Sequence, residues 1–479
     1  MDAATTTTRR HVTGLIVACA FVAVAFAAYH FYLRELMIHR GLTLGAVRPG
    51  VKVYRIVPLY LYWRPRLKTG VLIATAVLAG FVWWLRRSLR PSGANKRAGS
   101  AVVASLMAWH VAIAVSVALI DGGPGKLWEP FHVHRRSDYI GAVEWIDRPQ
   151  TFLQDYPQLM PDLPLHCRTH PPGGPLLLWM IAHSFGPGPF AASMATILLS
   201  SLATPAVYLL ARDVLDEAPA RLAAGIFLLA PNVVAYSATC LDAVFMVPLV
   251  WTMCFLWIGR RQRPMLFGMA AGITGSLAAL MTFSASVVEL WAVVALVLTA
   301  FCDPTRLRNT LVALAAAAVS SVLFYAVLNA WSGYDPLAVL RQAFEGQHEI
   351  TNGRGHSTLR QSVHFAVTNF VAFAFCSGLP IVLLWLRQSV REIPLATSSS
   401  ARWLLLSFLV TLVGIDVAPL YTLETERIWI FLVGFMAIGA AAHLNRTACR
   451  LDASPLVTAA LLLQAGQTVL MEVLFEWVW

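Results

Sequence analysis

The chain has 479 residues, of which 58% are hydrophobic and only 13% are charged, and its formal net charge is +11. A soluble globular domain carries about 25% charged residues, so this composition excludes an ordinary soluble enzyme and indicates a polytopic membrane protein. The basic residues lie in short loops beside apolar segments, which is the positive-inside pattern and argues against nucleic-acid binding.

Apolar stretches long enough to span a membrane recur along the whole chain. A spanning helix needs about 20 apolar residues, and this criterion predicts an all-α bundle of about 13 transmembrane helices. The first stretch follows Arg9 and Arg10 and is too long for the core of a signal peptide, so we expect a retained helix. The predicted spans are 12–33, 70–86, 101–120, 188–211, 221–239, 241–259, 264–283, 285–302, 309–332, 363–387, 402–420, 427–443 and 455–474.

The basic loops set the predicted orientation. With the start of the chain in the cytoplasm, nearly every inner loop is basic. The loop at 34–69 is an exception, because it comes out external yet is rich in Lys and Arg. Either it lies on the interface through "IVPLYLYW", or the helix count near the N-terminus is off by one. We therefore separate an N-terminal pair of helices, residues 1–100, from a transmembrane core, residues 101–479. The inner loops carry, among others, Arg86, Arg87, Arg90, Arg212, Arg260, Arg306, Arg308, Arg387, Arg391, Arg402, Arg446 and Arg450.

Two outer segments are long enough to have a function, residues 121–187 and 333–362. The first contains the apolar run "PLLLWMIAHSF", residues 175–185, which is too short to span and is predicted to be a helix lying on the outer surface. His110, inside the third span, is predicted to be a satisfied polar group within the bundle.

The first outer loop contains "HRRSDYIGAVEWIDRP". The segment from Asp138 to Asp147 is typical of a short amphipathic helix, with Tyr139, Val143 and Ile146 on one face. Asp138 has two interpretations. It is either a helix-start carboxylate that suits the helix dipole, or a general base in a cleft that partly excludes water.

The stretch "LHCRTHPPGGPLLLW" places Arg168 and His170 directly before a Pro-Pro-Gly-Gly break. The two prolines remove two backbone donors and favour an extended chain, which would aim the preceding side chains at a fixed target. An arginine and a histidine at the headgroup level suit a phosphate. The alternative is an arginine that extends to the interface beside an ordinary Pro-Gly helix start.

Asp242, in "SATCLDAVFMV", lies between two adjacent apolar runs near the outer edge of the helices. An ionisable residue at such a depth is a candidate functional residue, and a plain helix N-cap is the alternative. Cys240 lies two residues earlier, and we expect it and Cys167 to be free thiols.

Glu424, Glu426 and Arg427, in "LYTLETERIWIFLV", stand at the outer end of a late span, just before Trp429. They form either an ion pair beside an interfacial aromatic residue, or an arginine that grips phosphate and is oriented by the glutamates. In the second outer loop His356 is a substrate-binding candidate. Its histidine neighbours lack the tight spacing of a metal site, and no Walker, GxSxG, HExxH or GxGxxG motif is present.

The run from residue 138 to about 263 resembles the GT-C glycosyltransferases of the protein O-mannosyltransferase and lipid A aminoarabinose transferase kind. The shared order is an acidic residue in the first large outer loop, a Pro-Pro turn, a short interfacial helix and a second acid, here Asp242. "ETERIW" also resembles a late outer-edge motif of bacterial members of this group. Many members have a paired acid where this chain has Asp138-Tyr139, and a lysine where it has His170.

The resemblance implies a GT-C-type bundle with outer-face interfacial helices, in the plasma membrane of a bacterium. It implies transfer of a hexose or pentose, with inversion, from a polyprenyl-phosphate donor to a hydroxyl of a glycan, lipid or protein. Asp138 would be the base and Asp242 the second acid. Arg168, His170 and Arg427 would serve the donor phosphate. No cofactor is required in this interpretation, and a divalent metal is left open.

The alternative, from another functional class, is a multi-pass transporter or lipid flippase. That class needs polar groups and broken helices near the bilayer midplane.

Overall fold

The computed structural model forms two compact units, and each is built from separated stretches of the chain. Unit 1 comprises Met1–Lys126, Thr204–Ala238 and Ser362–Trp479, and unit 2 comprises Leu127–Ala203 and Thr239–Gln361. The predicted N-terminal segment, residues 1–100, lies wholly within unit 1. The residues that the structure describes are 3–39, 45–48, 51–55, 58–59, 61–90, 97–133, 139–351, 359–392, 400–418, 424–448 and 450–477.

The predicted all-α, polytopic fold is confirmed. Among the described residues 11 helices are long and apolar enough to cross a membrane, and two bent helix pairs bring the number to 13 if each pair is one span. Each predicted span overlaps one of these. The single helices and spans are α1 (Ala3–His39), α2 (Gly70–Ser88), α3 (Arg97–Ala118), Pro189–Val214, α11 (Asp242–Gly259), α12 (Pro264–Met281), α13 (Ala285–Cys302), Pro304–Ser332 with α14 (Leu307–Ser332), α18 (Ser400–Val417), Ile430–Thr447 with α20 (Val433–Thr447), and α21 (Pro455–Leu474).

The basic region after α1 contains a small antiparallel sheet that the sequence analysis did not predict. Its strands are β1 (Gly45–Arg48), β2 (Val51–Arg55), β3 (Leu61–Trp63) and β4 (Phe475–Trp477), in that order. Strand β3 pairs with β4, so the chain after α21 returns to the segment before α2. Arg64 Nη1 lies 3.0 Å from Glu476 Oε1 beside this pairing. The β-branched and aromatic residues of "VKVYR" and "LYW" favour strands.

The two bent pairs in unit 1 are stabilised by polar side chains of α21. One pair is α9 (Glu217–Leu228) with α10 (Pro231–Thr239), bent by 58°, and the other is α16 (Leu359–Ser377) with α17 (Leu379–Glu392), bent by 113°. At the first break, Thr468 Oγ1 and Gln464 Nε2 donate to the carbonyl of Leu229, at 2.7 and 3.2 Å.

At the second break, Gln464 Nε2 also donates to the carbonyl of Ser377, at 3.0 Å. Gln467 accepts from the amide of Leu379 at 2.8 Å and donates to the carbonyl of Phe375 at 2.8 Å. Gly378 turns the chain there, with a φ of +110°. In a bilayer every freed backbone group needs such a partner. α21 therefore makes both breaks compatible with burial.

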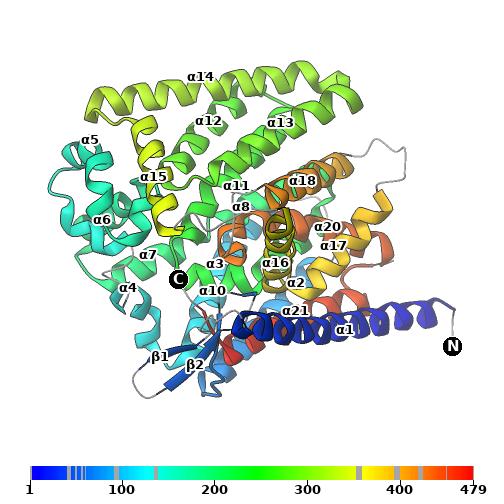
Figure 1. Ribbon diagram of the computed structural model, residues 1–479. Coiled ribbons are helices and arrows are strands. Elements are labelled where there is room, and N and C mark those ends of the chain that lie inside the picture. Colours follow the sequence, from blue (N-terminus) through cyan, green and yellow to red (C-terminus); the bar gives the residue numbers. More distant parts are fainter. Residues whose placement is uncertain are drawn as a thin grey trace. The chain divides into compact units, whose positions relative to one another are not determined.

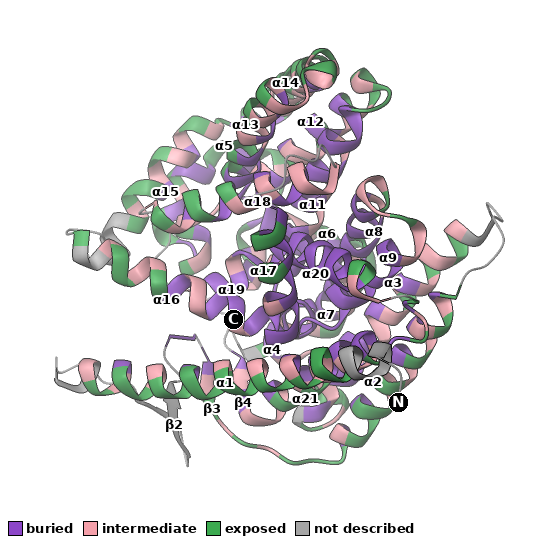
Figure 2. Cartoon of the chain, turned by 90° about the vertical axis from the view of Figure 1, so that its right-hand side faces the viewer, coloured by how far each residue is buried: buried purple, intermediate pink, exposed green. Residues whose placement is uncertain are grey.

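Burial in unit 1 is uneven from helix to helix. Most residues of α20 are buried, whereas α1 is largely exposed along its length (Figure 2). His110 of α3 is buried, and its Nδ1 and Nε2 lie 2.9 Å from Thr204 Oγ1 and Ser237 Oγ. The prediction that His110 is a satisfied polar group is confirmed.

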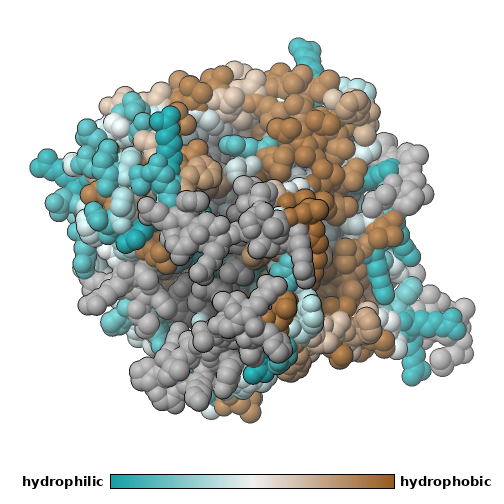
Figure 3. Space-filling model, viewed as in Figure 1, coloured by the Kyte–Doolittle hydropathy of each residue, from teal (hydrophilic) through white to brown (hydrophobic). Residues whose placement is uncertain are grey.

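In unit 2, α12, α13 and α14 lie side by side (Figure 1), and α12 packs closely on α14 through small residues. A Cβ on Gly268 would lie 2.3 Å from the carbonyl oxygen of Ala313, and one on Gly272 would lie 2.2 Å from that of Ala317. Glycines at this four-residue spacing let spanning helices approach backbone to backbone. The exposed apolar side chains of α13 and α14 contribute to the hydrophobic surface in Figure 3.

Candidate functional site

A hydrophobic cluster in unit 2 joins the short elements between residues 139 and 185 to the start of α11. It contains Tyr139, Tyr156, Cys167, Leu241 and Phe245 among its buried members. The elements that contribute are η3 (Tyr139–Trp145), α5 (Pro149–Leu159), η5 (Leu165–Thr169), α6 (Gly173–Phe185), α11 and α15 (Pro336–Thr351). The predicted amphipathic helix after Asp138 is thus a 3-10 helix, with Tyr139 and Ile146 buried as expected.

Tyr139 is the centre of this cluster, and it is 4% exposed. Its ring centroid lies 5.7 Å from those of His166 and Phe245 and 5.8 Å from that of His170. Asp138 directly precedes Tyr139, and Phe245 follows Asp242 by three residues on α11. The structure therefore brings together the residues flanking two predicted acids and the predicted phosphate-binding loop.

The Pro-Pro-Gly-Gly turn is needed for close packing at the start of α6. A Cβ on Gly174 would lie 2.8 Å from the Tyr139 ring, and one on Gly173 would lie 2.5 Å from the carbonyl oxygen of Leu280. Pro172 is the residue before the helix, and His170 is extended, with a φ of −131° and a ψ of 157°. α6 has 13 residues and is too short to span, as predicted.

Tyr156 of α5 fixes the loop before this turn. Its hydroxyl lies 3.0 Å from the carbonyl oxygens of both Cys167 and His170 and donates to them. Burial raises the pKa of Tyr156 well above its usual range, so the hydroxyl keeps the proton that it donates. The sequence analysis missed Tyr156, because nothing in its local sequence shows that it reaches residues 11 and 14 positions away.

Replacing Tyr156 with Phe is expected to lower the free energy of unfolding by about 1–2 kcal/mol, because the buried carbonyl of Cys167 and the partly buried carbonyl of His170 lose their donor. Thermal unfolding of the purified protein, followed by tryptophan fluorescence, measures this. Tyr62→Phe, in the small sheet of unit 1, is the matched control and should change little. An unchanged melting temperature in Y156F would contradict the role of the hydroxyl.

Arg168 is exposed and is oriented by the backbone. Its Nε donates to the carbonyl of Leu163 at 3.0 Å. The terminal Nη atoms form no hydrogen bond with any described residue. The main chain behind it is fixed by α15, because a Cβ on Gly346 would lie 2.9 Å from the carbonyl oxygen of Arg168. The terminal nitrogens are therefore available for a further charge-assisted hydrogen bond.

His170 is half-buried, and its Nδ1 lies 2.9 Å from the carbonyl oxygen of His166. A carbonyl only accepts, so Nδ1 carries the proton in this hydrogen bond. His166 itself was not singled out from the sequence, although it lies four residues before His170 and contacts the same tyrosine ring.

Asp242 is the first residue of α11, and Leu241 is the N-cap, so the structure does not make Asp242 a helix cap. Its carboxylate is partly exposed, and Oδ2 accepts a hydrogen bond from Cys240 Sγ at 2.7 Å. The positive end of the α11 dipole stabilises a carboxylate there. Cys240 and Cys167 are both free thiols, as predicted.

A cavity of about 370 Å³ lies beside η3 and α6 in unit 2. Its walls are mainly apolar, with His132 and Glu144 as polar groups, and its size falls within the range of small-molecule sites. Ile140, Val143 and Glu144 of η3 line it, so the cavity adjoins the element that Asp138 precedes. The remaining lining residues are Phe131, Leu178, Ile181, Ala182, Pro187, Gly188, Pro189 and Ala192.

The late motif belongs to unit 1, where Glu424 and Arg427 form an ion pair of 2.6 Å. Glu424 has a left-handed backbone, with a φ of 65°, and precedes the short helix α19 (Thr425–Ile428). Arg427 is 7% exposed and Glu426 is fully buried. Trp429 is also fully buried and packs edge to face on Phe373, so it is a core residue rather than an interfacial one.

Two predicted site residues, Asp138 and His356, lie outside the described residues. Arg168, His170 and Asp242 are in unit 2, whereas Glu424, Glu426 and Arg427 are in unit 1. That all of them line one hollow stays a prediction. Within the described ranges, no group of three or more His, Cys, Asp and Glu residues could hold a metal ion.

Residues 169–330, about a third of the chain, match a family model described as dolichyl-phosphate-mannose-protein mannosyltransferase. The predicted resemblance to GT-C glycosyltransferases is thus confirmed over the stretch that contains His170 and Asp242. A search of curated proteins gave no match.

Two groups of solved structures are similar to this chain. One is ArnT from Cupriavidus metallidurans in the apo state, with 14% identity, a TM-score of 0.41, and coverage of 62% of this chain and 55% of that one. The other is the oligosaccharyltransferase AglB from Archaeoglobus fulgidus, solved with an inhibitory peptide and a dolichol-phosphate. It has 14% identity and a TM-score of 0.49, and the match covers 77% of this chain and 56% of AglB. This chain spans just over half the length of each.

Proposed function

We propose that this multi-pass membrane protein is a glycosyltransferase that moves a hexose or pentose from a polyprenyl-phosphate donor to an acceptor hydroxyl. We place the reaction at the outer face of the bacterial inner membrane. The observation that carries the proposal is the family match across residues 169–330, which covers the Pro-Pro turn and the start of α11. Tyr139 supports it, because this residue directly follows Asp138 and its ring contacts His170 and Phe245 within the matched region.

In the proposed reaction Asp138 accepts the proton of the acceptor hydroxyl while the oxygen of that hydroxyl attacks the anomeric carbon. The bond between that carbon and the donor phosphate oxygen breaks, and polyprenyl phosphate leaves with the electron pair. Attack opposite the leaving group inverts the configuration. A positioned base contributes about 10²–10⁴-fold to such a step. Asp242, as the second acid, would position the acceptor or the sugar.

The donor phosphate would bind to Arg168 and His170, with Arg427, Glu424 and Glu426 as further ligands and orienting groups. The geometry of Arg168 supports this role. Its Nε donates to the carbonyl of Leu163, and its side chain is exposed, which leaves the terminal nitrogens for the phosphate. Arg427 would exchange part of its contact with Glu424 for the phosphate. His356 is proposed as a further substrate contact. The proposed reaction requires no metal, and a divalent ion at the phosphate stays open.

The two bent helix pairs are a feature that a transporter would also need. The carbonyl groups at these breaks accept hydrogen bonds from α21, so they are used within the protein. We therefore keep transport or lipid flipping as the second candidate, to be separated by experiment.

Purified protein in proteoliposomes with a labelled polyprenyl-phosphate sugar tests the proposal. We expect transfer to an added acceptor, or slow release of free sugar from the donor in its absence. Movement of intact donor across the bilayer without any turnover would instead support the transporter. A parallel reaction with a chelator determines whether a divalent metal is needed.

Arg168→Ala and Arg427→Ala are each expected to weaken donor binding by about 10-fold or more, because a charge-assisted contact to phosphate contributes about 1.5–3 kcal/mol. Titration of the purified variants with the donor lipid measures this, and Arg168→Lys should recover part of the loss. Unchanged donor affinity in both alanine variants would remove them from the phosphate site.

A further inference from the structure

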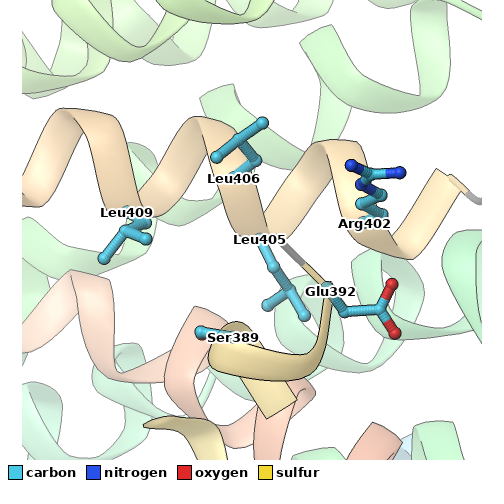
Figure 4. Close-up of a pocket in the computed structure, with 6 residues that line it drawn as sticks. All are labelled: Ser389, Glu392, Arg402, Leu405, Leu406 and Leu409. Carbon is cyan, nitrogen blue, oxygen red and sulfur yellow. The ribbon is translucent and has the colours of Figure 1, made fainter. Parts of the chain in front are cut away.

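A crevice in unit 1, lined by none of the candidate site residues, combines a charged end with an apolar wall. Ser389 and Glu392 of α17 line it, together with four residues of α18. Figure 4 shows Arg402 and Glu392 at one end and Leu409 toward the other. The α18 residues of the lining are Arg402, Leu405, Leu406 and Leu409.

One face of α18 continues this pattern beyond the crevice. Arg402, Leu406, Leu409 and Val413 follow at steps of four, three and four residues, which places them on one side of a helix. Leu406 and Leu409 are half-buried, and Val413 is 54% exposed. At about 1.5 Å per residue the stripe is about 16 Å long, close to the depth of one leaflet of a hydrocarbon core of about 30 Å.

The charged end of the crevice has an excess of cations. Arg402 lines this end, Arg446 of α20 is paired with its Glu392, and Arg387 and Arg391 precede Glu392 on α17. Glu392 is 7% exposed and is already bonded to Arg446 and, at 2.8 Å, to Gln388 Nε2. Arg387 and Arg391 are exposed and form no ion pair with any described residue. An anion at this end would therefore meet a net positive field.

A buried polar atom also faces the crevice. Ser389 is 7% exposed, and its Oγ has no hydrogen-bond partner among the described residues. Buried hydroxyl groups normally have a partner, so a ligand with an ester or phosphate oxygen would complete this one.

We propose that this crevice binds one anionic glycerophospholipid. The phosphate lies at Arg402 in the field of the α17 arginines, an ester oxygen accepts from Ser389 Oγ, and an acyl chain follows Leu406, Leu409 and Val413. Charge at one end excludes a purely apolar occupant, and the apolar stripe excludes a free inorganic anion as the preferred ligand. These arginines lie in predicted cytoplasmic loops, which places the lipid in the inner leaflet, where basic sites between spanning helices recognise anionic headgroups.

Native mass spectrometry of the full chain in detergent tests this, with phosphatidylglycerol and phosphatidylcholine of identical acyl chains as probes. We expect one phosphatidylglycerol to be retained in preference to phosphatidylcholine, and R402Q to weaken its binding about five- to tenfold. Arg308→Gln is the matched control, because Arg308 is an exposed arginine at the predicted inner end of α14 in unit 2. Arg402→Lys should bind nearly as well as the natural protein.

Thermal stabilisation by added lipid gives a second measurement, which does not require the variants to be purified in equal amounts. Phosphatidylglycerol should raise the melting temperature of the natural protein and of R308Q, and raise it less in R402Q. Equal loss of binding in R402Q and R308Q would overturn the proposal in favour of general surface charge. Equal retention of the two lipids would also overturn it, as would equal stabilisation by inorganic phosphate alone.

Discussion

Replacing Asp138 with Asn is expected to reduce sugar transfer by about 10²–10⁴-fold while donor binding and membrane insertion stay close to normal. The amide has the size of the carboxylate but cannot take the acceptor proton, so the loss falls on the chemical step. Initial rates of transfer from the labelled donor measure it. Separate titration with the donor lipid distinguishes a lost base from a lost binding contact.

Asp147→Asn is the control for D138N. Asp147 is an exposed carboxylate in the same predicted outer loop, nine positions later, and its replacement removes the same charge from that loop. We expect D147N to keep nearly full activity. Full activity in D138N would assign the base elsewhere, and Asp242→Asn is then the next variant to measure. Equal losses in D138N and D147N would point to the charge of the loop rather than to a base.

The transmembrane architecture was predictable because each span carries its own signal. A run such as 264–283 must be apolar throughout to enter a bilayer, so it is visible without knowledge of its neighbours. The short helix at α6 was visible for the same reason, since its length excludes a span. Free thiols at Cys167 and Cys240 and a satisfied His110 were also inferred correctly.

The contacts between elements were not predictable, because they join residues far apart in sequence. Nothing local shows that the Tyr139 ring meets Phe245, or that Tyr156 holds the carbonyl groups before the Pro-Pro turn. Gln464 and Thr468 similarly serve the carbonyl of Leu229, more than two hundred positions away. β4 is three residues long and pairs with β3 across the chain, so its strand character depends on that partner.

Gly173 was predicted only as part of a Pro-Pro-Gly-Gly turn, but in the structure it determines how closely α6 approaches α12. It is the first residue of α6, and a Cβ there would lie 2.5 Å from the carbonyl oxygen of Leu280 and 2.9 Å from the carbonyl carbon. These are main-chain atoms at the end of α12, which cannot rotate away as a side chain would. A methyl group therefore forces α6 and α12 apart.

Gly173→Ala is accordingly expected to lower the free energy of unfolding by about 1–3 kcal/mol, the usual cost of overpacking. It should also lower transfer by at least 10-fold, since α6 follows His170 by only three residues and a misplacement of about 1 Å costs on the order of 100-fold. Thermal unfolding and initial rates measure the two effects.

Gly125→Ala is the matched control for this substitution. Gly125 lies in the short 3-10 helix η2 (Pro124–Leu127), does not line the cavity beside α6, and a Cβ there meets nothing within 4 Å. The same added methyl group should therefore leave both stability and transfer unchanged. If G173A and G125A behave alike, α6 is not held against the end of α12, and the turn has no part in positioning the phosphate-binding loop. If G173A loses stability but keeps full transfer, the packing of α6 against α12 is confirmed, and the proposal that the turn positions His170 is wrong.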